Sequence, residues 1–214
     1  MMMYDDTVIL LYAKAPVAGT VNTRLIPDIG VNAATQLQHD LIHHRLSMLT
    51  QADLCTVQLM CAPDEQHEFF LRCDKQYPIE LNQQYGNDLG ERMFNGVVKA
   101  LRSYKYCIVI GTDAPSLDEI MIKRAIDTLH TGAQVVLVPA EDGGYVLLGL
   151  QQSCDFLFKD IGWGSADVLQ QSIDKLKENN ISYQQLATCW DIDCLQDYQR
   201  YLSLFGSALE SPLN

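Results

Sequence analysis

YCIVIGTDAPS, residues 106–116, decides the fold. It begins with a continuous apolar run rich in β-branched side chains, which is typical of a strand buried on both faces of a parallel sheet. Gly111 allows the chain to turn, and Ser116 followed by Glu119 predicts the capping box of a helix over residues 117–129. Asp113 therefore stands at the carboxyl end of a central strand, where open α/β sheets bind ligands, and is the first candidate functional residue.

Similar patterns outward from this stretch predict alternating strands and helices in one domain spanning residues 1–214, with a tail that frays after about residue 206. The expected strands are 7–13, 54–60, 79–82, 133–139, 145–150 and 182–186. The expected helices are 33–51 capped by Asn32, 64–72, 89–102 capped by Asp88, a helix from Ser165 to about 179, and 195–205. This order predicts an α/β fold with a mostly parallel sheet.

Composition limits the classes of partner. The net charge of −12 repels nucleic acid polymers, and no apolar run reaches the roughly 20 residues of a membrane span. The start MMMYDD lacks the basic region of a signal peptide, so we expect a cytoplasmic protein. Seven cysteines without a Cys-x-x-Cys pair predict free, mostly buried thiols rather than disulfides or a zinc site. The oligomeric state stays open.

The segment after the first strand, KAPVAGTVNTRLIPDIG, is longer than an ordinary connection and contains the only lysine and arginine before Arg45. Lys14 and Arg24 are either solvated loop charges or, as we favour, an anion cradle, with Gly19 allowing close backbone approach. The segment is not a P-loop, because the Gly-Lys-Ser/Thr core is absent. A phosphorylated small molecule is the expected ligand.

QQYGNDLGERM begins another helix. Asp88 and Glu91 have capping-box spacing, so Asp88 is either a structural cap or part of a helix terminus that offers N–H groups to a nucleotide. Gln84 and Arg92 flank it.

EDGG, residues 141–144, is either a plain hairpin turn or the floor of a sugar or acceptor site, in which Asp142 acts as a base or binds hydroxyl groups. Trp163 is either a stacking platform or a core residue. Near the end of the chain, Asp191 and Asp193 alternate on an extended segment, so at most one of them faces a shared metal. Asp193 can instead cap the last helix.

Six stretches in order resemble one bacterial family of glycosyltransferase-A-fold, nucleotide-diphospho-sugar transferase-like proteins, described as a domain of unknown function: KAPVAGTVNTRL, GNDLGERM, IVIGTDAPSL, VPAEDGGYVLLGL, FKDIGWGSADVL and DIDCLQDY. The resemblance covers nearly the whole chain. It implies a Rossmann-like three-layer α/β/α sandwich that binds a nucleotide with Mg²⁺ or Mn²⁺, and it extends to nucleotidyltransferases of molybdopterin, phospholactate and isoprenoid pathways. One departure is Asn22, where the family pattern has a lysine.

By this resemblance Asp113 and Asp193 take the places of the two metal ligands. The expected nucleotide-binding residues are Ala13, Lys14, Gly19, Arg24, Gln84, Asp88, Gly90, Arg92 and Thr112, with Asp142 and Arg24 as catalytic residues and Gly143, Gly144 and Trp163 at the acceptor or sugar. Physical reasoning also favours a bound cation. A diphosphate beside Asp113 and Asp193 would place like charges close together, and two such charges about 4 Å apart repel by roughly 4 kcal/mol at an effective dielectric constant of 20.

The leading hypothesis is a metal-dependent glycosyltransferase that uses a nucleotide-diphospho-sugar donor. One alternative is a nucleotidyltransferase that joins a nucleoside triphosphate to a sugar- or acid-phosphate and releases pyrophosphate. Another is a nucleotide-binding protein without turnover.

Overall fold

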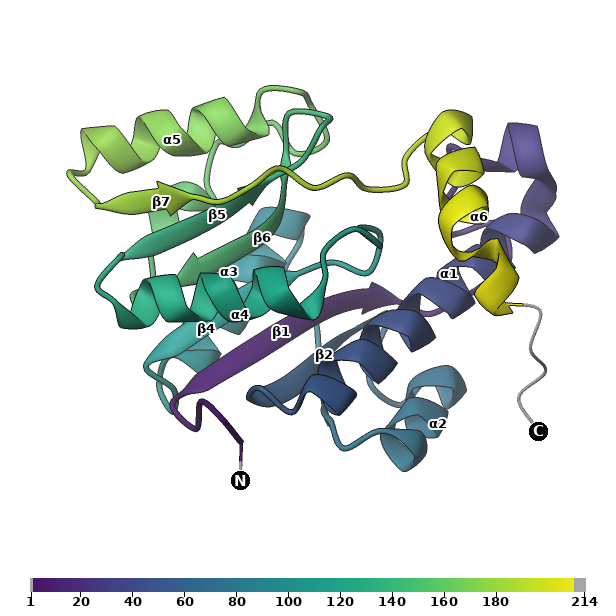
Figure 1. The fold of residues 1–214 in the computed structure, drawn as a ribbon, viewed down its shortest axis with the longest axis horizontal. Helices are drawn as coiled ribbons and strands as arrows, with labels where there is room; N and C mark the ends of the chain where they lie inside the picture. Colours follow the sequence, from purple (N-terminus) through teal and green to yellow (C-terminus); the bar gives the residue numbers. More distant parts are fainter. Residues whose placement is uncertain (1, 210–214) are drawn as a thin grey trace.

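The computed structural model describes residues 2–209, which form a seven-stranded sheet in the order β3-β2-β1-β4-β6-β5-β7 (Figure 1). The strands are β1 (Thr7–Lys14), β2 (Thr56–Ala62), β3 (Glu80–Gln83), β4 (Tyr106–Ile110), β5 (Val135–Pro139), β6 (Tyr145–Leu150) and β7 (Tyr183–Gln185). All neighbouring pairs are parallel except those that β6 makes with β4 and β5. The predicted mostly parallel sheet is confirmed, and β4 lies at its centre.

Helices cover both faces of the sheet (Figure 1). They are α1 (Ile26–Ala52), α2 (Glu68–Gln76), α3 (Leu89–Ala100), α4 (Glu119–His130), the short 3₁₀ helix η1 (Asp155–Leu157), α5 (Val168–Glu178) and α6 (Leu195–Leu209). Ile9 and Ile108 pack in the core beneath α1, α2 and α4, whereas Leu10 and Val109 pack in the core beneath α3 and α5. Alternate side chains of each central strand thus fill opposite cores, and this burial explains the continuous apolar runs.

A third, smaller core joins the first half of α1 to α6 and to the segment before α6. Leu25 and Leu41, at and within α1, pack with Trp190, Ile192 and Tyr201 from the segment before α6 and from α6 itself. This contact places α6 beside the first half of α1 (Figure 1). The last helix runs to Leu209, beyond its predicted end at 205, and the rest of the predicted frayed tail, residues 210–214, lies outside the described residues.

Helix α1 starts earlier than predicted. It begins at Ile26, where Pro27 suits the first turn because its missing N–H needs no partner there. A kink follows at Gly30, whose φ of 81° is left-handed. Gly30 also has a ψ of 161°, so it separates a short first helical stretch from a longer second one. The second stretch corresponds to the predicted helix over residues 33–51, and Asn32 lies two residues after the break.

The predicted caps Ser116 and Ser165 are also wrong. Asp118 caps α4 by accepting the Met121 amide at 2.7 Å, because the turn after β4 is longer than the capping-box spacing assumed. Helix α5 begins only at Val168, after Asp167. Helix α2 likewise begins at Glu68 rather than at residue 64.

Asp88 does cap α3, and its carboxylate accepts the Glu91 amide at 2.8 Å. The structural reading of Asp88 is confirmed. The carboxylate of Glu91 accepts the backbone N–H of Asn87, whereas a standard capping box would use the N–H of the cap residue Asp88.

All seven cysteines are free, and six of them are buried, as predicted. Within residues 2–209, no helix has the length and apolar content needed to cross a membrane.

Candidate functional site

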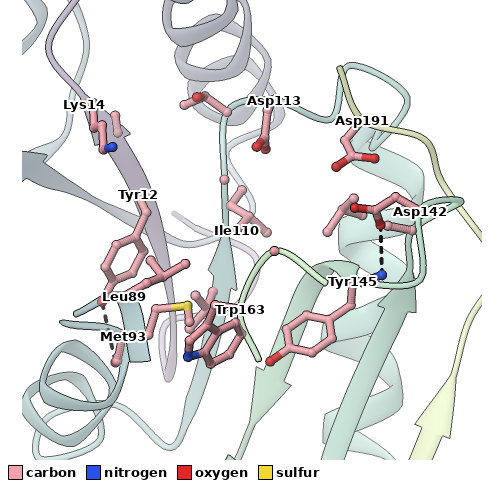
Figure 2. A pocket seen from close by; sticks show the side chains of 18 of the residues that line it. Tyr12, Lys14, Leu89, Met93, Ile110, Asp113, Asp142, Tyr145, Trp163 and Asp191 are labelled. Carbon is pink, nitrogen blue, oxygen red and sulfur yellow. Dashed lines mark hydrogen bonds between the residues drawn. The ribbon is translucent and has the colours of Figure 1, made fainter. Parts of the chain in front are cut away.

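A cavity of about 470 Å³ opens beyond the carboxyl ends of β1 and β4 (Figure 2). Its size is within the usual range for small-molecule sites. Three carboxylates, those of Asp113, Asp142 and Asp191, line one side of it. The side chains of Tyr12 and Trp163 line the other side together with apolar residues.

The turn after β4 presents Asp113 to this cavity. A side chain at Gly111 would place a Cβ only 2.6 Å from the Asp113 carboxylate, so glycine leaves the space that this carboxylate occupies. The Asp113 carbonyl accepts the Ile192 amide at 2.9 Å, which ties the turn to the segment before α6. The carboxylate meets solvent inside the cavity, although protein surrounds it on most sides.

The acidic residues influence one another. The protein around Asp113 raises the pKa of its carboxyl, and the charges of Asp193 and Asp142 raise it further, whereas its own backbone amide and the guanidinium of Arg45 oppose them. Burial, followed by the charges of Asp113 and Asp142, raises the pKa of Asp191 to about 7. The cluster therefore holds more negative charge than nearby cations offset.

Hydrogen bonds and one ion pair fix the three acidic segments relative to one another. The hydroxyl of Ser116 donates to the Trp190 carbonyl at 2.6 Å and accepts the Trp190 amide at 2.8 Å. The Glu141 amide donates to the Cys189 carbonyl at 3.0 Å. Arg200 adds a 2.9 Å ion pair with Glu141 and lies over the Trp190 ring. The carboxylates are therefore held in place before any ligand binds.

Asp142 and Gly144 line the cavity from the turn between β5 and β6. The hairpin prediction for EDGG is confirmed, and the same turn also faces the cavity. The Asp142 carboxylate accepts the Gly144 amide at 2.8 Å. Gly143 does not line the cavity; it has a φ of 93°, and a Cβ there would lie 2.1 Å from the carbonyl oxygen of Ala166. Its role is to pack this turn against the start of α5.

The end of β1 and the loop that follows it lie in two places. Ala13 and Lys14 line the cavity, but Gly19 does not. Arg24 forms an ion pair with Asp193 beside a second cavity of about 180 Å³. Asp193 and Arg24 thus lie together outside the first cavity, although the charge of Asp193 still raises the pKa of Asp113. Asp191, rather than Asp193, lines the first cavity together with Asp113.

Asn22 also has a structural task. It has a left-handed φ of 47°, a conformation that asparagine tolerates better than most residues. Its amide donates to the Ala34 carbonyl in α1 at 3.0 Å, which holds the loop against that helix.

Gln84 and Thr112 line the cavity, as expected, but the other residues predicted around α3 do not. The amide of Gln84 donates to the carbonyls of Ala13 and Met60, at 3.2 and 2.8 Å, and so ties the ends of β1 and β2 together. Arg92 bonds the Gly86 carbonyl at 3.0 Å. Asp88 is the helix cap described above.

Gly90 allows α3 to approach the segment that carries Trp163. A Cβ at Gly90 would lie 2.3 Å from the Phe158 carbonyl oxygen and 2.8 Å from the indole nitrogen of Trp163. Trp163 lines the cavity and also packs on the core beneath α3 and α5, so its core contact is confirmed and its use as a stacking platform stays a prediction. Tyr145 meets it edge-on at 6.3 Å.

Sequence patterns do not single out Asp191, Tyr12 or Tyr145 as site residues. Asp191 had a signal, the alternation of Asp191 and Asp193 on one extended segment. The two tyrosines lie inside apolar strand runs, where nothing local separates a cavity-lining ring from a core ring.

A family model described as "Uncharacterized protein conserved in bacteria (DUF2064)" matches residues 45–165, more than half of the chain. No curated protein matches this chain. Among solved structures, a candidate nucleotide-diphospho-sugar transferase from Desulfovibrio desulfuricans G20 is 27% identical to this chain, with a TM-score of 0.83, over 97% of this chain and 89% of that one.

Two more distant structures share the fold. CMP:2-keto-3-deoxy-manno-octonic acid synthetase complexed with CTP is 10% identical, with a TM-score of 0.61, over 95% of this chain and 100% of that one. For 4-diphosphocytidyl-2C-methyl-D-erythritol synthase from Anaerococcus prevotii DSM 20548 the identity is 10% and the TM-score 0.61, over 94% of this chain and 100% of that one. The predicted fold of nucleotide-diphospho-sugar transferases is therefore confirmed.

Proposed function

The chain belongs to the family described as "Uncharacterized protein conserved in bacteria (DUF2064)", and we propose that it is a transferase. In this proposal it binds a nucleotide-diphospho-sugar in the cavity beyond β4 and passes the sugar to an acceptor. The likeness to a candidate nucleotide-diphospho-sugar transferase supports this class of activity. A cytoplasmic location is part of the proposal, because free buried thiols suit a reducing compartment.

The observation that carries the proposal is the meeting of two unlike surfaces in one cavity. Asp113, Asp142 and Asp191 converge on one side, and the rings of Tyr12 and Trp163 lie on the other (Figure 2). A nucleotide sugar has the matching halves, because its base offers a flat face to aromatic and aliphatic side chains and its diphosphate requires cations. Ligand charge and ligand shape thus both favour such a donor.

Mg²⁺ or Mn²⁺ fits the acidic side. Such ions prefer oxygen ligands and bind through one or two carboxylates together with substrate phosphates. Asp113 and Asp191 are the residues that we propose to hold the ion, and Lys14 would add a fixed positive charge for the phosphates. Within residues 2–209, no three acidic, histidine or cysteine side chains are placed to hold an ion by themselves, so phosphate oxygens would complete the shell. When bound, the ion would stabilise the negative charge of the departing nucleoside diphosphate.

Asp142 has a separate role in this proposal. Its carboxylate is exposed to the cavity, and the bond from the Gly144 amide fixes its direction. From this position it would orient the acceptor hydroxyl and take its proton. Arg24 would contact the phosphates only after leaving Asp193, because the two side chains form an ion pair.

The test is calorimetry with a panel of nucleotide sugars, with and without Mn²⁺. Asp113→Asn should abolish the metal-dependent part of binding and leave the circular dichroism spectrum unchanged. Asp174→Asn is the matched control, since this residue lies exposed on α5 beside Lys177 and outside the cavity, and it should retain that binding. Metal-dependent affinity that survives in Asp113→Asn would contradict the assignment.

Products then distinguish the reactions. A glycosyltransferase releases a nucleoside diphosphate from the donor, whereas a nucleotidyltransferase releases pyrophosphate from a nucleoside triphosphate. Saturable binding without either product would instead identify a nucleotide-binding protein without turnover.

A further inference from the structure

Arg45 is a charged side chain buried in the main core. It lies on the inner face of α1 with 1% of its surface exposed, and it is the only charged residue of the described chain that is buried. Its two terminal nitrogens donate to the carbonyls of Ala114 and Leu117, and its Nε has no partner. Within residues 2–209, no carboxylate forms an ion pair with it. Arg45 therefore bonds the main chain of one turn.

That turn, residues 111–118, is the one that presents Asp113 to the cavity. Its buried carbonyls need donors, and Pro115 contributes no N–H. On the outer side, the segment before α6 holds the turn through Ser116 and through the Asp113 carbonyl. Arg45, from α1, adds its two bonds to the carbonyls of Ala114 and Leu117. The two sets of bonds together fix the backbone from the Asp113 carbonyl to Leu117.

Core stability alone does not require an arginine at this position. Burying a guanidinium without a carboxylate partner costs free energy, and a well-packed apolar side chain of similar volume is often as stable or more stable. A planar fork with donors on two nitrogens is, however, suited to holding two carbonyls three residues apart in a fixed geometry. Methionine has no donor, and lysine has its donors on one freely rotating nitrogen. The contacts thus favour a role for Arg45 in fixing the conformation of the turn.

We propose that Arg45 is a positioning residue that holds the turn of Asp113 in the conformation that binds a divalent metal ion. This inference rests on the proposed function, in which Asp113 is a metal ligand. The positive charge of Arg45 by itself repels a cation. Geometry and charge therefore predict opposite effects of its removal: a disordered turn weakens metal binding, whereas the loss of repulsion alone tightens it.

The test measures binding of Mn²⁺ alone to the full chain by electron paramagnetic resonance, together with hydrogen–deuterium exchange of the turn. Arg45→Lys keeps the charge and loses the fork, and Arg45→Met loses both. Losing one hydrogen bond from a charged donor should weaken Mn²⁺ binding by about tenfold in Arg45→Lys, with more loss in Arg45→Met. Exchange in residues 112–118 should rise in both variants. Arg72→Lys, in an exposed ion pair on α2, is the control and should change neither quantity.

Unchanged or tighter Mn²⁺ binding in either variant would overturn the proposal. Arg45→Lys needs little repacking, so it provides the decisive measurement if Arg45→Met does not fold. If the wild-type protein binds no Mn²⁺, the metal part of the proposed function fails, and the exchange of the turn still decides whether Arg45 orders it. If the wild-type protein binds Mn²⁺ and Arg45→Lys matches it in affinity and exchange, the role of Arg45 fails and the proposed function stands.

Discussion

Replacing Asp191 by asparagine tests the electrostatics of the cavity with almost no change in its shape. The two side chains have similar size, and asparagine cannot ionise. In the wild-type protein, burial and the charges of Asp113 and Asp142 raise the pKa of Asp191 to about 7, from an ordinary value of 3.8. The folded protein therefore keeps a proton on this carboxyl that the unfolded chain releases near pH 4.

The sign and size of the effect follow from proton linkage. Between pH 4 and 7 the folded state binds more protons than the unfolded state, so the wild-type protein loses stability as the pH rises. A gap of about 3 between the two pKa values corresponds to a loss of about 4 kcal/mol that is complete above pH 7 and absent below pH 4. Asp191→Asn removes this loss. The variant should match the wild-type protein near pH 4 and exceed its free energy of unfolding by up to about 4 kcal/mol at pH 8.

Urea unfolding followed by circular dichroism, from pH 4.5 to 8.5 with EDTA present, measures this difference. Asp174→Asn is the matched control. Its carboxylate pairs with Lys177 on the surface of α5, so we expect a change within about 1 kcal/mol and no gain at high pH. A difference between Asp191→Asn and the wild-type protein that stays constant with pH, or that falls as the pH rises, would refute the electrostatic account of the cluster.

Three further outcomes follow from the structure. Asn22→Lys should lower the free energy of unfolding by about 1–2 kcal/mol, because lysine loses the hydrogen bond to Ala34 and is strained at a left-handed φ. Calorimetry should nevertheless show tighter binding of a nucleoside diphosphate, because the variant adds a cation, and weaker binding would contradict this. Gly143→Ala should cost about 2–4 kcal/mol in urea, because a Cβ meets Ala166, whereas Gly132→Ala, also left-handed but in open space, should cost less; equal costs would refute the clash. The rise in melting temperature with Mn²⁺ should be larger at pH 8 than at pH 5, because the carboxylates must be ionised to bind; the reverse order in a thermal shift assay would count against a carboxylate site.

Local pattern was sufficient for the main architecture. Continuous apolar runs such as residues 106–110 identify strands buried on both faces. Such strands predict a sheet covered on both sides, even where the exact bounds of the helices are predicted wrongly. Asp113 follows from the same pattern, because the residue after a central strand must stand at the carboxyl edge of the sheet. The cap at Asp88 and the hairpin around Asp142 are equally local, since residues within four positions of each other make both structures.

Tertiary structure decided which polar side chains meet. The alternation of Asp191 and Asp193 shows that one of them faces inward, but the choice depends on how the segment is seated, and that is set by the bonds of Trp190 to Ser116 and of Ile192 to the Asp113 carbonyl. These partners lie more than seventy positions apart in the chain. A local pattern contains no information about such a register, because periodicity fixes the direction of a side chain relative to its own backbone and not relative to a distant segment.

Ser116 and Arg45 illustrate the same limit. Ser116 has the spacing of a helix cap, yet the longer turn moves the cap to Asp118 and leaves the hydroxyl to bind another segment. Arg45 reads as one polar residue in an amphipathic helix, and only the packing of α1 against the turn after β4 shows that its guanidinium bonds the carbonyls of Ala114 and Leu117. The free energy of a buried polar group depends on the partners that the fold brings to it, and those partners come from parts of the chain that are distant in sequence.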